Sequence, residues 1–546
     1  MNGYDAIAAI MRKEGVKWMA CFPDHALINA VAKAGIKPVV FRQERGGIMA
    51  ADGYSRMMAS KGSYGVFACQ HGPGVENAFG GIAQAWGDAV PLLFLPDGYP
   101  THRHDVDPFF NAVMNYQNIT KLAIPITGPE RLEGQMRRAF HALKNGRPGP
   151  VLVEMPRGGF MLDEVPAVDG YKPAIRSVSA PSATDVKDAV KHLLAAKRPV
   201  LWAGQGVLYS AAAAELRELA ELTQIPVIGT MQGKSAFDER HPLSLGATNK
   251  TAPKAVWKWI KESDAICALG ASFSRTNYGI DIPAGKFVIH NTNHVEDIGK
   301  EYPTDVGLAG DTKLTLQMMI EEVKATIGPN GRDGEAVRAE IAAVKREWLE
   351  EWSPFLNSND RPINPYRLVN EINKAVDHEN TIFTHDAGHP RDEVMPFYTA
   401  TVPGSYVGWG KTTHLGYGIG LMIGAKLACP DKFCVNFMGD AAFGMSGLDI
   451  ETSVRYGAPI TTILLNNGTM GGYAERMPSA MEEFNAGNMG GDYAMIAEGL
   501  GARGIKVSDP AEIGPALTKA KQINDNEGRS VLLDISTKPE THFSVY

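Results

Sequence analysis

Short apolar runs alternate with segments of helical spacing along most of the chain. The clearest example lies near the C-terminus, where an apolar run at 433–438 ends in Gly439 and Asp440. A segment of helical spacing follows, and then a second apolar run at 460–465. This order predicts a strand, a turn, a helix and a second strand. Because parallel strands end at one edge of a sheet, where ligands bind, we expect Asp440 and Asn467 to be neighbours.

The N-terminal part of the chain shows the same alternation. Its predicted strands cover residues 18–22, 38–41, 65–69, 91–95 and 151–154, and its predicted helices cover 6–13, 26–34 and a long segment from Gly47. Farther along, predicted strands cover 199–202, 226–229, 265–269 and 286–290. Strands that alternate with helices are typical of mostly parallel α/β sheets.

Two segments without periodicity divide the chain. Residues 166–182 are rich in Pro, Ala, Ser and Val, and a second linker lies near 357–365. A chain of 546 residues is too long for a single hydrophobic core. The pattern therefore predicts three α/β domains of similar size, at 1–165, 183–345 and 360–546.

Composition narrows the class of protein. Hydrophobic content of 44% and charged content of 21% are ordinary globular values, and a net charge of −7 gives no basic footprint for nucleic acid. The five cysteines are odd in number and show no CxxC pair, which argues against a thiolate metal site or a disulfide framework. No signal-peptide pattern and no membrane-length apolar run is present. We expect a soluble cytoplasmic protein without nucleic-acid or membrane partners.

Asp440 and Asn467 are candidate metal ligands. A carboxylate and an amide oxygen suit a six-coordinate Mg²⁺ that completes its shell with a carbonyl, water and a substrate phosphate. Backbone N–H groups at the start of the following helix can bind a diphosphate. The alternative is an ordinary strand, turn and helix with polar turn residues.

In this chain Gly439-Asp440 is followed by Asn467, 27 residues after the aspartate. This motif resembles the diphosphate- and metal-binding motif of thiamine diphosphate (ThDP) enzymes. The resemblance covers essentially the whole chain and is strongest at 41–56 and 438–471. It implies three doubly wound parallel-sheet domains, namely a pyrimidine-binding, a middle and a pyrophosphate-binding domain. It also implies that Asp440, Asn467 and the main-chain carbonyl of Thr469 bind Mg²⁺.

Glu44 is the candidate activator of the cofactor. The segment from Arg42 to Arg56 strongly resembles the glutamate segment of acetolactate-synthase-like enzymes. In such enzymes a buried carboxyl with a raised pKa protonates the aminopyrimidine, which lets the cofactor form its own carbanion. The alternative is a solvated glutamate at a strand end, paired with Arg42 or Arg45.

Residues 69–77 resemble the Gly-Pro-Gly-x-x-Asn turn that lines the catalytic centre of the family. By position, Gln70 and His71 would polarise or protonate substrate, and Gly74 and Asn77 would contact the cofactor. The alternative for His71 is a turn histidine bonded to the backbone.

Two further segments, 386–389 and 412–418, resemble family segments that reach the diphosphate and hold the cofactor bent. Leu415 is by position the bulky apolar residue that wedges the cofactor into its bent form. Pro390 stands where many relatives have histidine, and Ala441 where a serine is common. The cofactor contacts implied by the resemblance are Glu44, Gly74, Asn77, His389, Thr413, Leu415, Gly439, Ala441, Ala442, Asn467 and Met470.

The middle domain resembles a nucleotide-binding domain at 289–300, but asparagines stand at two usual aspartates. FAD, ADP or CoA, or no nucleotide at all, remain open for this domain. For a CoA ester, Arg275, Lys286 and Lys300 are candidate phosphate ligands, and the alternative is that they are solvated surface charges.

The resemblance implies ThDP- and Mg²⁺-dependent cleavage or formation of a C–C bond next to a carbonyl. The helix after Asp440 resembles the oxalyl-CoA decarboxylase and 2-hydroxyacyl-CoA lyase branch, whereas segments 72–74 and 297–299 resemble acetolactate synthases. The substrate is thus a 2-oxo acid, an acyloin or an acyl-CoA. The alternatives are a FAD-containing 2-oxo acid oxidase and a non-catalytic nucleotide-binding protein. By resemblance, the active site lies between two subunits of a homodimer or homotetramer.

Overall fold

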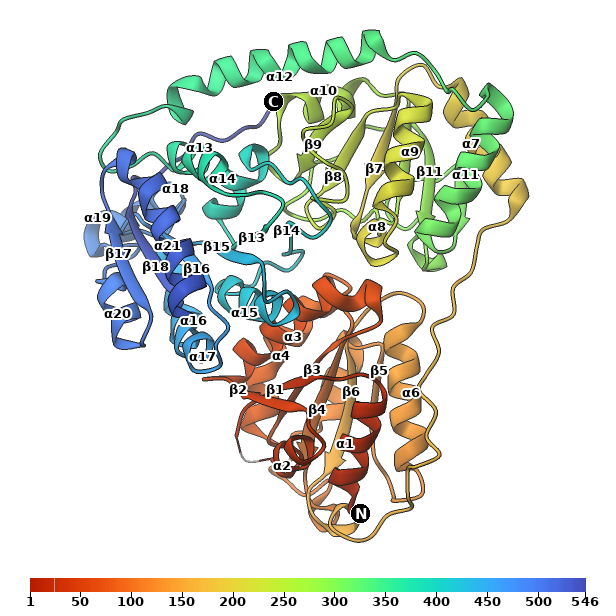
Figure 1. Cartoon of the computed structure of the whole chain (residues 1–546), viewed down its shortest axis with the longest axis vertical. Coiled ribbons are helices and arrows are strands. Elements are labelled where there is room, and N and C mark those ends of the chain that lie inside the picture. Colours follow the sequence, from red (N-terminus) through yellow and green to blue (C-terminus); the bar gives the residue numbers. More distant parts are fainter. Residues whose placement is uncertain (24) are drawn as a thin grey trace.

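The computed structural model describes residues 1–23 and 25–546. Within these ranges the named strands form three sheets of six strands each, and every pairing between them is parallel. Helices flank each sheet (Figure 1). In each sheet the chain winds outward in both directions from an interior strand, as in a doubly wound fold. The predicted α/β class is confirmed.

The first sheet has the order β2-β1-β3-β4-β6-β5. Alternate residues of its strands enter two different hydrophobic clusters, one for each face, so both faces are buried. This explains the continuous apolar runs in the sequence. The elements are α1 (Gly3–Lys13), β1 (Trp18–Cys21), α2 (Ala26–Lys33), β2 (Lys37–Val40), α3 (Glu44–Met58), β3 (Gly65–Cys69), α4 (Pro73–Gly87), β4 (Leu92–Gly98), α5 (Ala112–Tyr116), β5 (Leu122–Pro125), α6 (Leu132–Lys144) and β6 (Val151–Pro156).

The second sheet has the order β12-β11-β10-β7-β8-β9. Its outermost strands, β12 and β9, have no counterpart among the sequence predictions, because both are short and β9 contains a glycine. The elements are α7 (Ala183–Ala195), β7 (Pro199–Ala203), α8 (Gln205–Tyr209), α9 (Ala213–Thr223), β8 (Val227–Thr230), β9 (Ser244–Thr248), α10 (Lys254–Glu262), β10 (Ala265–Leu269), β11 (Phe287–Thr292), β12 (Val306–Ala309), α11 (Thr312–Ile327) and α12 (Glu335–Leu356).

The third sheet has the order β14-β13-β15-β16-β18-β17, so β13, β15 and β16 are adjacent. The elements are α13 (Pro365–Ala375), β13 (Thr381–His385), α14 (His389–Phe397), β14 (Tyr406–Val407), α15 (Gly418–Ala428), β15 (Phe433–Gly439), α16 (Asp440–Ser446), α17 (Ile450–Arg455), β16 (Thr461–Asn466), α18 (Tyr473–Arg476), α19 (Pro478–Phe484), α20 (Tyr493–Gly499), β17 (Arg503–Val507), α21 (Ile513–Glu527) and β18 (Val531–Ser536).

One helix prediction is wrong at its start. The helix expected from Gly47 begins at Glu44, directly after the extended residue Gln43. Glycine weakens a helix signal in sequence, but here tertiary packing decides, because a Cβ on Gly47 would lie 2.5 Å from the Phe67 ring. The helical spacing at 448–455 corresponds to α17, which begins at Ile450, whereas α16, which begins directly at Asp440, was not predicted.

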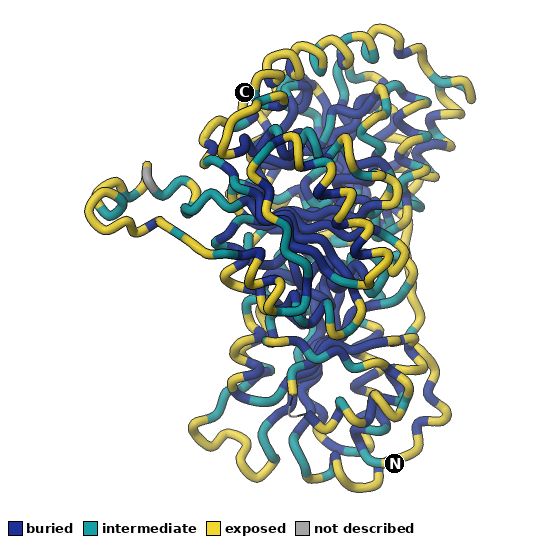
Figure 2. Tube along the Cα trace, turned by 60° about the vertical axis from the view of Figure 1, so that its left-hand side comes forward, coloured by how far each residue is buried: buried dark blue, intermediate teal, exposed yellow. Residues whose placement is uncertain are grey.

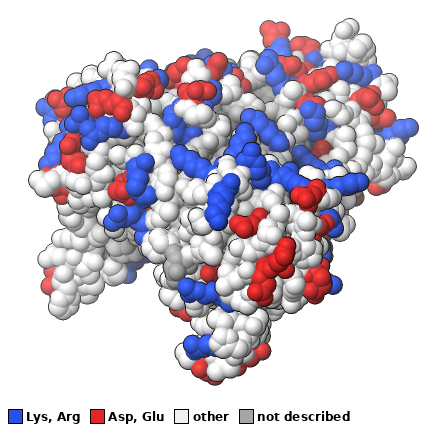
Figure 3. Space-filling view, turned by 60° about the horizontal axis from the view of Figure 1, so that its bottom comes forward, with Lys and Arg blue, Asp and Glu red and all other residues white. Residues whose placement is uncertain are grey.

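The sheets form the buried interior, and exposed residues lie mainly on the helices and loops around them (Figure 2). On the face drawn in Figure 3, Lys and Arg side chains lie among Asp and Glu side chains. Among the residues that the structure describes, no helix is both long enough and apolar enough to cross a membrane.

The first and third sheets are joined through a close crossing of α3 and α15 (Figure 1). Glycines line this crossing: a Cβ on Gly53 would overlap the carbonyl oxygen of Leu421, and a Cβ on Gly424 would overlap the carbonyl oxygen of Ala50. The two backbones therefore approach more closely than helices with side chains at these positions could.

We expect Gly53→Ala to destabilise the protein, because the new methyl group must push the Leu421 carbonyl away. Overpacking of this kind typically costs about 1–3 kcal/mol. Gly134→Ala is the matched control, since Gly134 lies in α6 with no atom near its would-be Cβ. Thermal unfolding should show a lower midpoint for Gly53→Ala only. Equal midpoints for the two variants would contradict the tight crossing.

Candidate functional site

The candidate site lies at the carboxyl edge of the third sheet. The strands β13, β15 and β16 are neighbours, with His385 opposite Phe437 and Gly439 opposite Leu465. The residues that follow these strand ends therefore meet at one edge of the sheet, as the sequence pattern predicts.

Asp440 and Asn467 lie together at this edge. Asp440 is only 2% exposed, and its Oδ2 accepts a hydrogen bond from the backbone N–H of Gly468 at 3.0 Å. Its Oδ1 accepts one from Ala441 at 2.8 Å. The Oδ1 of Asn467 accepts from the backbone N–H of Thr469 at 3.1 Å. The turn after β16 is thus wrapped around the Asp440 carboxylate.

This donor set fits a hard divalent cation. Burial raises the pKa of Asp440, and no ion pair within 4.0 Å of its carboxylate is found among the residues that the structure describes. A buried carboxylate that lacks a cationic partner is stabilised by a bound cation. In residues 1–23 and 25–546, no three His, Cys, Asp or Glu side chains converge on a metal position. Such a cluster is not needed, because Mg²⁺ accepts one carboxylate with amide, carbonyl and water oxygens.

Residues on the other side of the edge come from the start of α14. The His389 ring packs against Gly471, where a Cβ would lie 2.6 Å from its Nδ1, and against the Phe543 ring at 5.0 Å between centroids. Burial lowers the pKa of His389, which favours the neutral ring. Met470 is held by a 2.9 Å bond from its N–H to Gly487, and the half-buried Ala441 and the buried Ala442 begin α16.

Asp386 is a residue of this edge that sequence reasoning left without a role. Its buried carboxylate accepts from the backbone N–H groups of Gly416 and Gly418, each at 2.9 Å. Burial raises its pKa to about 6, although these N–H groups oppose the shift. The carboxylate thereby ties the loop that carries Thr413 and Leu415 to the end of β13. Its place directly after an apolar strand was the signal for it in the sequence.

Glu44 belongs to a second group of residues, on the first sheet. It is the first residue of α3 and is 3% exposed. Asn77 donates from Nδ2 to its Oε2 at 3.3 Å, and a Cβ on Gly74 would lie 3.3 Å from its Oε1. Burial raises the pKa of Glu44, which favours the protonated carboxyl.

The alternative interpretation of Glu44 as a solvated, arginine-paired residue is wrong. Arg42 pairs with Glu451 at 3.7 Å, and Arg45 donates from Nη2 to the carbonyl of Met445 at 3.2 Å. Both arginines therefore reach across to the segment after Asp440.

Gln70 and His71 follow the end of β3 and are both half-buried. Gln70 packs beside Gly74, where a Cβ would lie 2.9 Å from its Cγ. The His71 ring meets the Tyr99 ring edge-on, with 4.8 Å between centroids. Both side chains thus lie near the turn that precedes Asn77, and their chemical roles remain predictions.

The two groups approach each other through α4. Asn77 lies near the start of this helix, and a Cβ on Gly80, one turn later, would lie 2.7 Å from the His414 ring. Among the described residues, no hydrogen bond or ion pair links Glu44 directly to Asp440. Within one chain the two groups are connected through α4 and the loop that precedes α15, and through the bonds of Arg42 and Arg45 to the segment after Asp440.

A separate cleft lies between the first and second sheets. Its volume is about 260 Å³, and its lining includes Gly204, Ser272, Arg275 and Lys411. Gly204, Gln205 and Gly206, which directly follow β7 in the middle domain, therefore face this cavity.

The structure narrows the predicted nucleotide contacts of this cleft. Lys286 and Lys300 are not among the lining residues. Lys286 donates to the carbonyl of Ser263, and Lys300 donates to the carboxylate of Asp297, which does line the cleft, each at 2.6 Å. Asn291 is fully buried, and its Nδ2 donates to three acceptors within the middle domain. It does not present a ribose-binding carboxylate, so this position does not fit the FAD contact of the resemblance.

Three parallel sheets, with candidate cation ligands at the edge of one and a buried carboxyl at the edge of another, are typical of an α/β enzyme with a cofactor site. Family models described as thiamine pyrophosphate enzyme domains match the chain at residues 1–119 (N-terminal TPP binding domain), 186–319 (central domain) and 386–535 (C-terminal TPP binding domain). The chain belongs to this family and is a ThDP-dependent enzyme.

Curated relatives extend over nearly the full chain. A probable acetolactate synthase large subunit of Methanocaldococcus jannaschii is 31% identical over 99% of this chain and 92% of its own length. An acetolactate synthase large subunit of Corynebacterium glutamicum is 30% identical over 91% and 80%. A glyoxylate carboligase of Escherichia coli O157:H7 is 26% identical over 100% and 94%. These matches confirm the resemblance to acetolactate-synthase-like enzymes.

We expect Asp440→Ala to bind ThDP with Mg²⁺ at least about 10–100-fold more weakly, because loss of even an outer-shell partner of a metal ligand has effects of that size. The fold should persist, since the variant removes a buried carboxylate that makes only backbone bonds. Calorimetric titration of the cofactor-free protein measures the affinity. Asp525→Ala, an exposed carboxylate of α21, is the control. Equal affinities would contradict the metal assignment.

Proposed function

We propose that the protein is a ThDP- and Mg²⁺-dependent carboligase that joins a fragment of a 2-oxo acid to a second carbonyl compound. The observation that carries this proposal is the buried Glu44 at the start of α3, whose carboxyl accepts a hydrogen bond from Asn77 of α4. It occurs in a chain whose relatives are named acetolactate synthase and glyoxylate carboligase.

The carboxyl of Glu44 is the proposed proton donor to the cofactor. When bound, ThDP provides a carbanion that adds to a carbonyl carbon. Asn77 donates from Nδ2 to Oε2 of Glu44, which leaves Oε1 as the oxygen available to carry a proton. A methyl group at position 74 would lie 3.3 Å from Oε1 and crowd it. Glycine at this position therefore leaves space beside the oxygen. Burial raises the pKa of this carboxyl, which favours the protonated form that can donate a hydrogen bond to a ring nitrogen.

The third domain holds the charged end of the cofactor. Asp440, Asn467 and the carbonyl of Thr469 would bind Mg²⁺, and the backbone N–H groups that open α16 would bind the diphosphate with His389. Asp386 fixes the loop of Leu415 against the same edge. Gln70 and His71 would orient the substrate at the edge of the first sheet.

The substrate class follows from the relatives and from the cleft. Synthase and carboligase names favour bond formation from 2-oxo acids over an acyl-CoA substrate. Of the three basic residues suggested for a CoA ester, only Arg275 lines the cleft, and Lys286 is bonded to the carbonyl of Ser263 away from it. The flavin-dependent oxidase is not favoured, because Asn291 serves the domain itself.

Glu44→Gln should bind ThDP but slow proton exchange at its reactive ring carbon by roughly 10²–10⁴-fold, the usual effect of losing a positioned acid–base group. Hydrogen exchange followed by NMR after acid quench measures this rate. Glu133→Gln, at a partly exposed glutamate of α6, should exchange as the wild type does. Exchange at the wild-type rate in Glu44→Gln would refute the proposed mechanism.

The proposed assembly is a homodimer or homotetramer. Exposed large apolar side chains lie on both site-bearing domains, and obligate interfaces bury such surface, typically more than about 2,000 Å². These side chains are Phe79 and Met114 in the first domain and Met445, Leu448, Phe484 and Met495 in the third.

Mixing two inactive variants tests whether subunits share a site. If Glu44 of one subunit serves Asp440 of another, dissociated and reassociated Glu44→Gln and Asp440→Ala proteins should regain activity. Random pairing in a C₂ dimer gives roughly a quarter of the wild-type value. Light scattering gives the oligomeric state of each sample. Absence of any recovery in mixed dimers, or a fully active monomer, would contradict the shared site.

A further inference from the structure

The loop between β14 and α15, residues 408–418, is held in an unusual shape. Thr413, a β-branched residue, has a φ of 59°, and Gly410 and Gly416 have φ of 112° and 81°. A β-branched residue in the left-handed region is strained, and such strain persists only where the surroundings fix the backbone. The loop carries Thr413 and Leu415, which under the proposed function contact the cofactor.

Asp88, at the end of α4 in the first domain, fixes the start of this loop. Its two carboxylate oxygens accept from the adjacent backbone N–H groups of Gly410 and Lys411, at 2.8 and 2.9 Å. Gln84, one turn earlier on α4, fixes the middle. Its Oε1 accepts from the Thr412 hydroxyl at 2.8 Å and from the backbone N–H of His414 at 3.2 Å.

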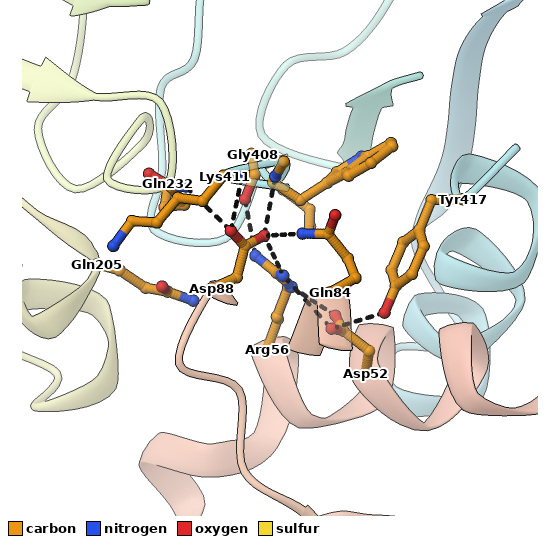
Figure 4. A network of polar contacts seen from close by, with 12 residues as sticks. Asp52, Arg56, Gln84, Asp88, Gln205, Gln232, Gly408, Lys411 and Tyr417 are labelled. Atoms are coloured by element: carbon orange, nitrogen blue, oxygen red, sulfur yellow. Dashed lines mark hydrogen bonds and ion pairs between the residues drawn. The ribbon is translucent and has the colours of Figure 1, made fainter. Parts of the chain in front are cut away.

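Arg56 of α3 balances the charge of Asp88. Its Nη2 donates to Asp88 at 2.8 Å, and its Nη1 donates to the carbonyl of Gly408 at 2.8 Å, the first residue of the loop. Arg56 also pairs with Asp52, which accepts from the Tyr417 hydroxyl at 3.0 Å (Figure 4). Burial opposes ionisation of Asp88, but Arg56 and the two backbone N–H groups outweigh it and lower the pKa.

The second domain reaches the same point. Gln232 donates to Asp88 at 3.3 Å, and Lys411 donates from Nζ to the Ser272 hydroxyl at 2.6 Å. Figure 4 shows Asp88 pointing toward Arg56 and Gln84, with Gln232 and Lys411 on its other side. All three domains therefore meet at one buried carboxylate.

We propose that Asp88 is a positioning residue, which with Arg56 and Gln84 holds loop 408–418 in the strained shape that presents Thr413 and Leu415 to the cofactor. The inference rests on the proposed function, because it assigns this loop to the cofactor. A carboxylate is required: an asparagine at 88 would turn an N–H₂ group toward Arg56 or toward a backbone N–H, and one of these donors would lose its acceptor.

The test is Asp88→Asn, compared with wild type at saturating ThDP and Mg²⁺. We expect kcat to fall roughly 10–100-fold, since a misplacement of about 1 Å costs up to 10²-fold, while the KM of the substrate stays close to its wild-type value. The circular-dichroism signal of the bound cofactor should change. In the cofactor-free protein, hydrogen exchange of segment 408–418 should become faster.

Two further variants make the result specific. Gln84→Met removes the acceptor of the loop's middle, together with the 2.9 Å bond that Gln84 donates from Nε2 to Asp88, but it keeps the Asp88 carboxylate and its ion pair with Arg56. It should show the same changes to a smaller degree. Glu14→Gln is the matched control. Glu14 is also a buried carboxylate of the first domain, bonded to Lys144, Tyr171 and a backbone N–H, but it lies outside the loop. It should alter stability without altering kcat, the cofactor signal or exchange in 408–418.

The outcomes separate the two proposals. A wild-type protein that shows no ThDP-dependent activity refutes the proposed function. A wild type that binds and uses ThDP, with Asp88→Asn matching it in kcat, cofactor signal and loop exchange, overturns the positioning role. If Asp88→Asn does not fold, Gln84→Met decides by the same three measurements, and changes no larger than those of Glu14→Gln overturn the proposal.

Discussion

The close crossing of α3 and α15 is the constraint on which the site depends. Both helices begin at functional positions, α3 with Glu44 and α15 with Gly418, whose N–H binds Asp386. With side chains at 53 and 424 the two backbones could not approach as closely as they do. The crossing therefore fixes how the first domain, with the buried Glu44, lies against the third.

Four buried carboxyl groups near this crossing differ in protonation because their partners differ. Glu44 meets one amide, so burial dominates and its pKa rises. Asp386 meets backbone N–H groups, which moderate the rise to about 6. Asp88 meets a guanidinium as well, and its pKa falls. Asp440 has backbone donors but no cation from the described chain, which leaves it suited to a metal ion. The same carboxyl group thereby serves as candidate acid, loop anchor, ion-pair partner and candidate metal ligand.

The sequence predicts the parts of this molecule that depend on local pattern. Apolar runs mark the interior strands, and the rule for parallel strand ends places Asp440 next to Asn467 before any coordinates are considered. The helix start at Glu44 is hidden, because Gly46 and Gly47 are unfavourable in an isolated helix and are explained only by partners from other elements. The hydrogen bond from the backbone N–H of Gly410 to Asp88 joins residues 322 positions apart. Because the donor is a backbone group, the pattern of side chains in the sequence gives no sign of it.

The contacts between the three domains at loop 408–418 also affect how domains can be exchanged between such enzymes. Each of the three domains has its own sheet, and exchanging whole domains between relatives would seem a simple way to obtain new specificities. The donors and acceptors that meet at Asp88, however, come from α3, α4, the second domain and the loop itself. A chimera that replaces one domain must therefore inherit these segments as a set, since a single mismatched partner leaves a buried charge without its counterpart.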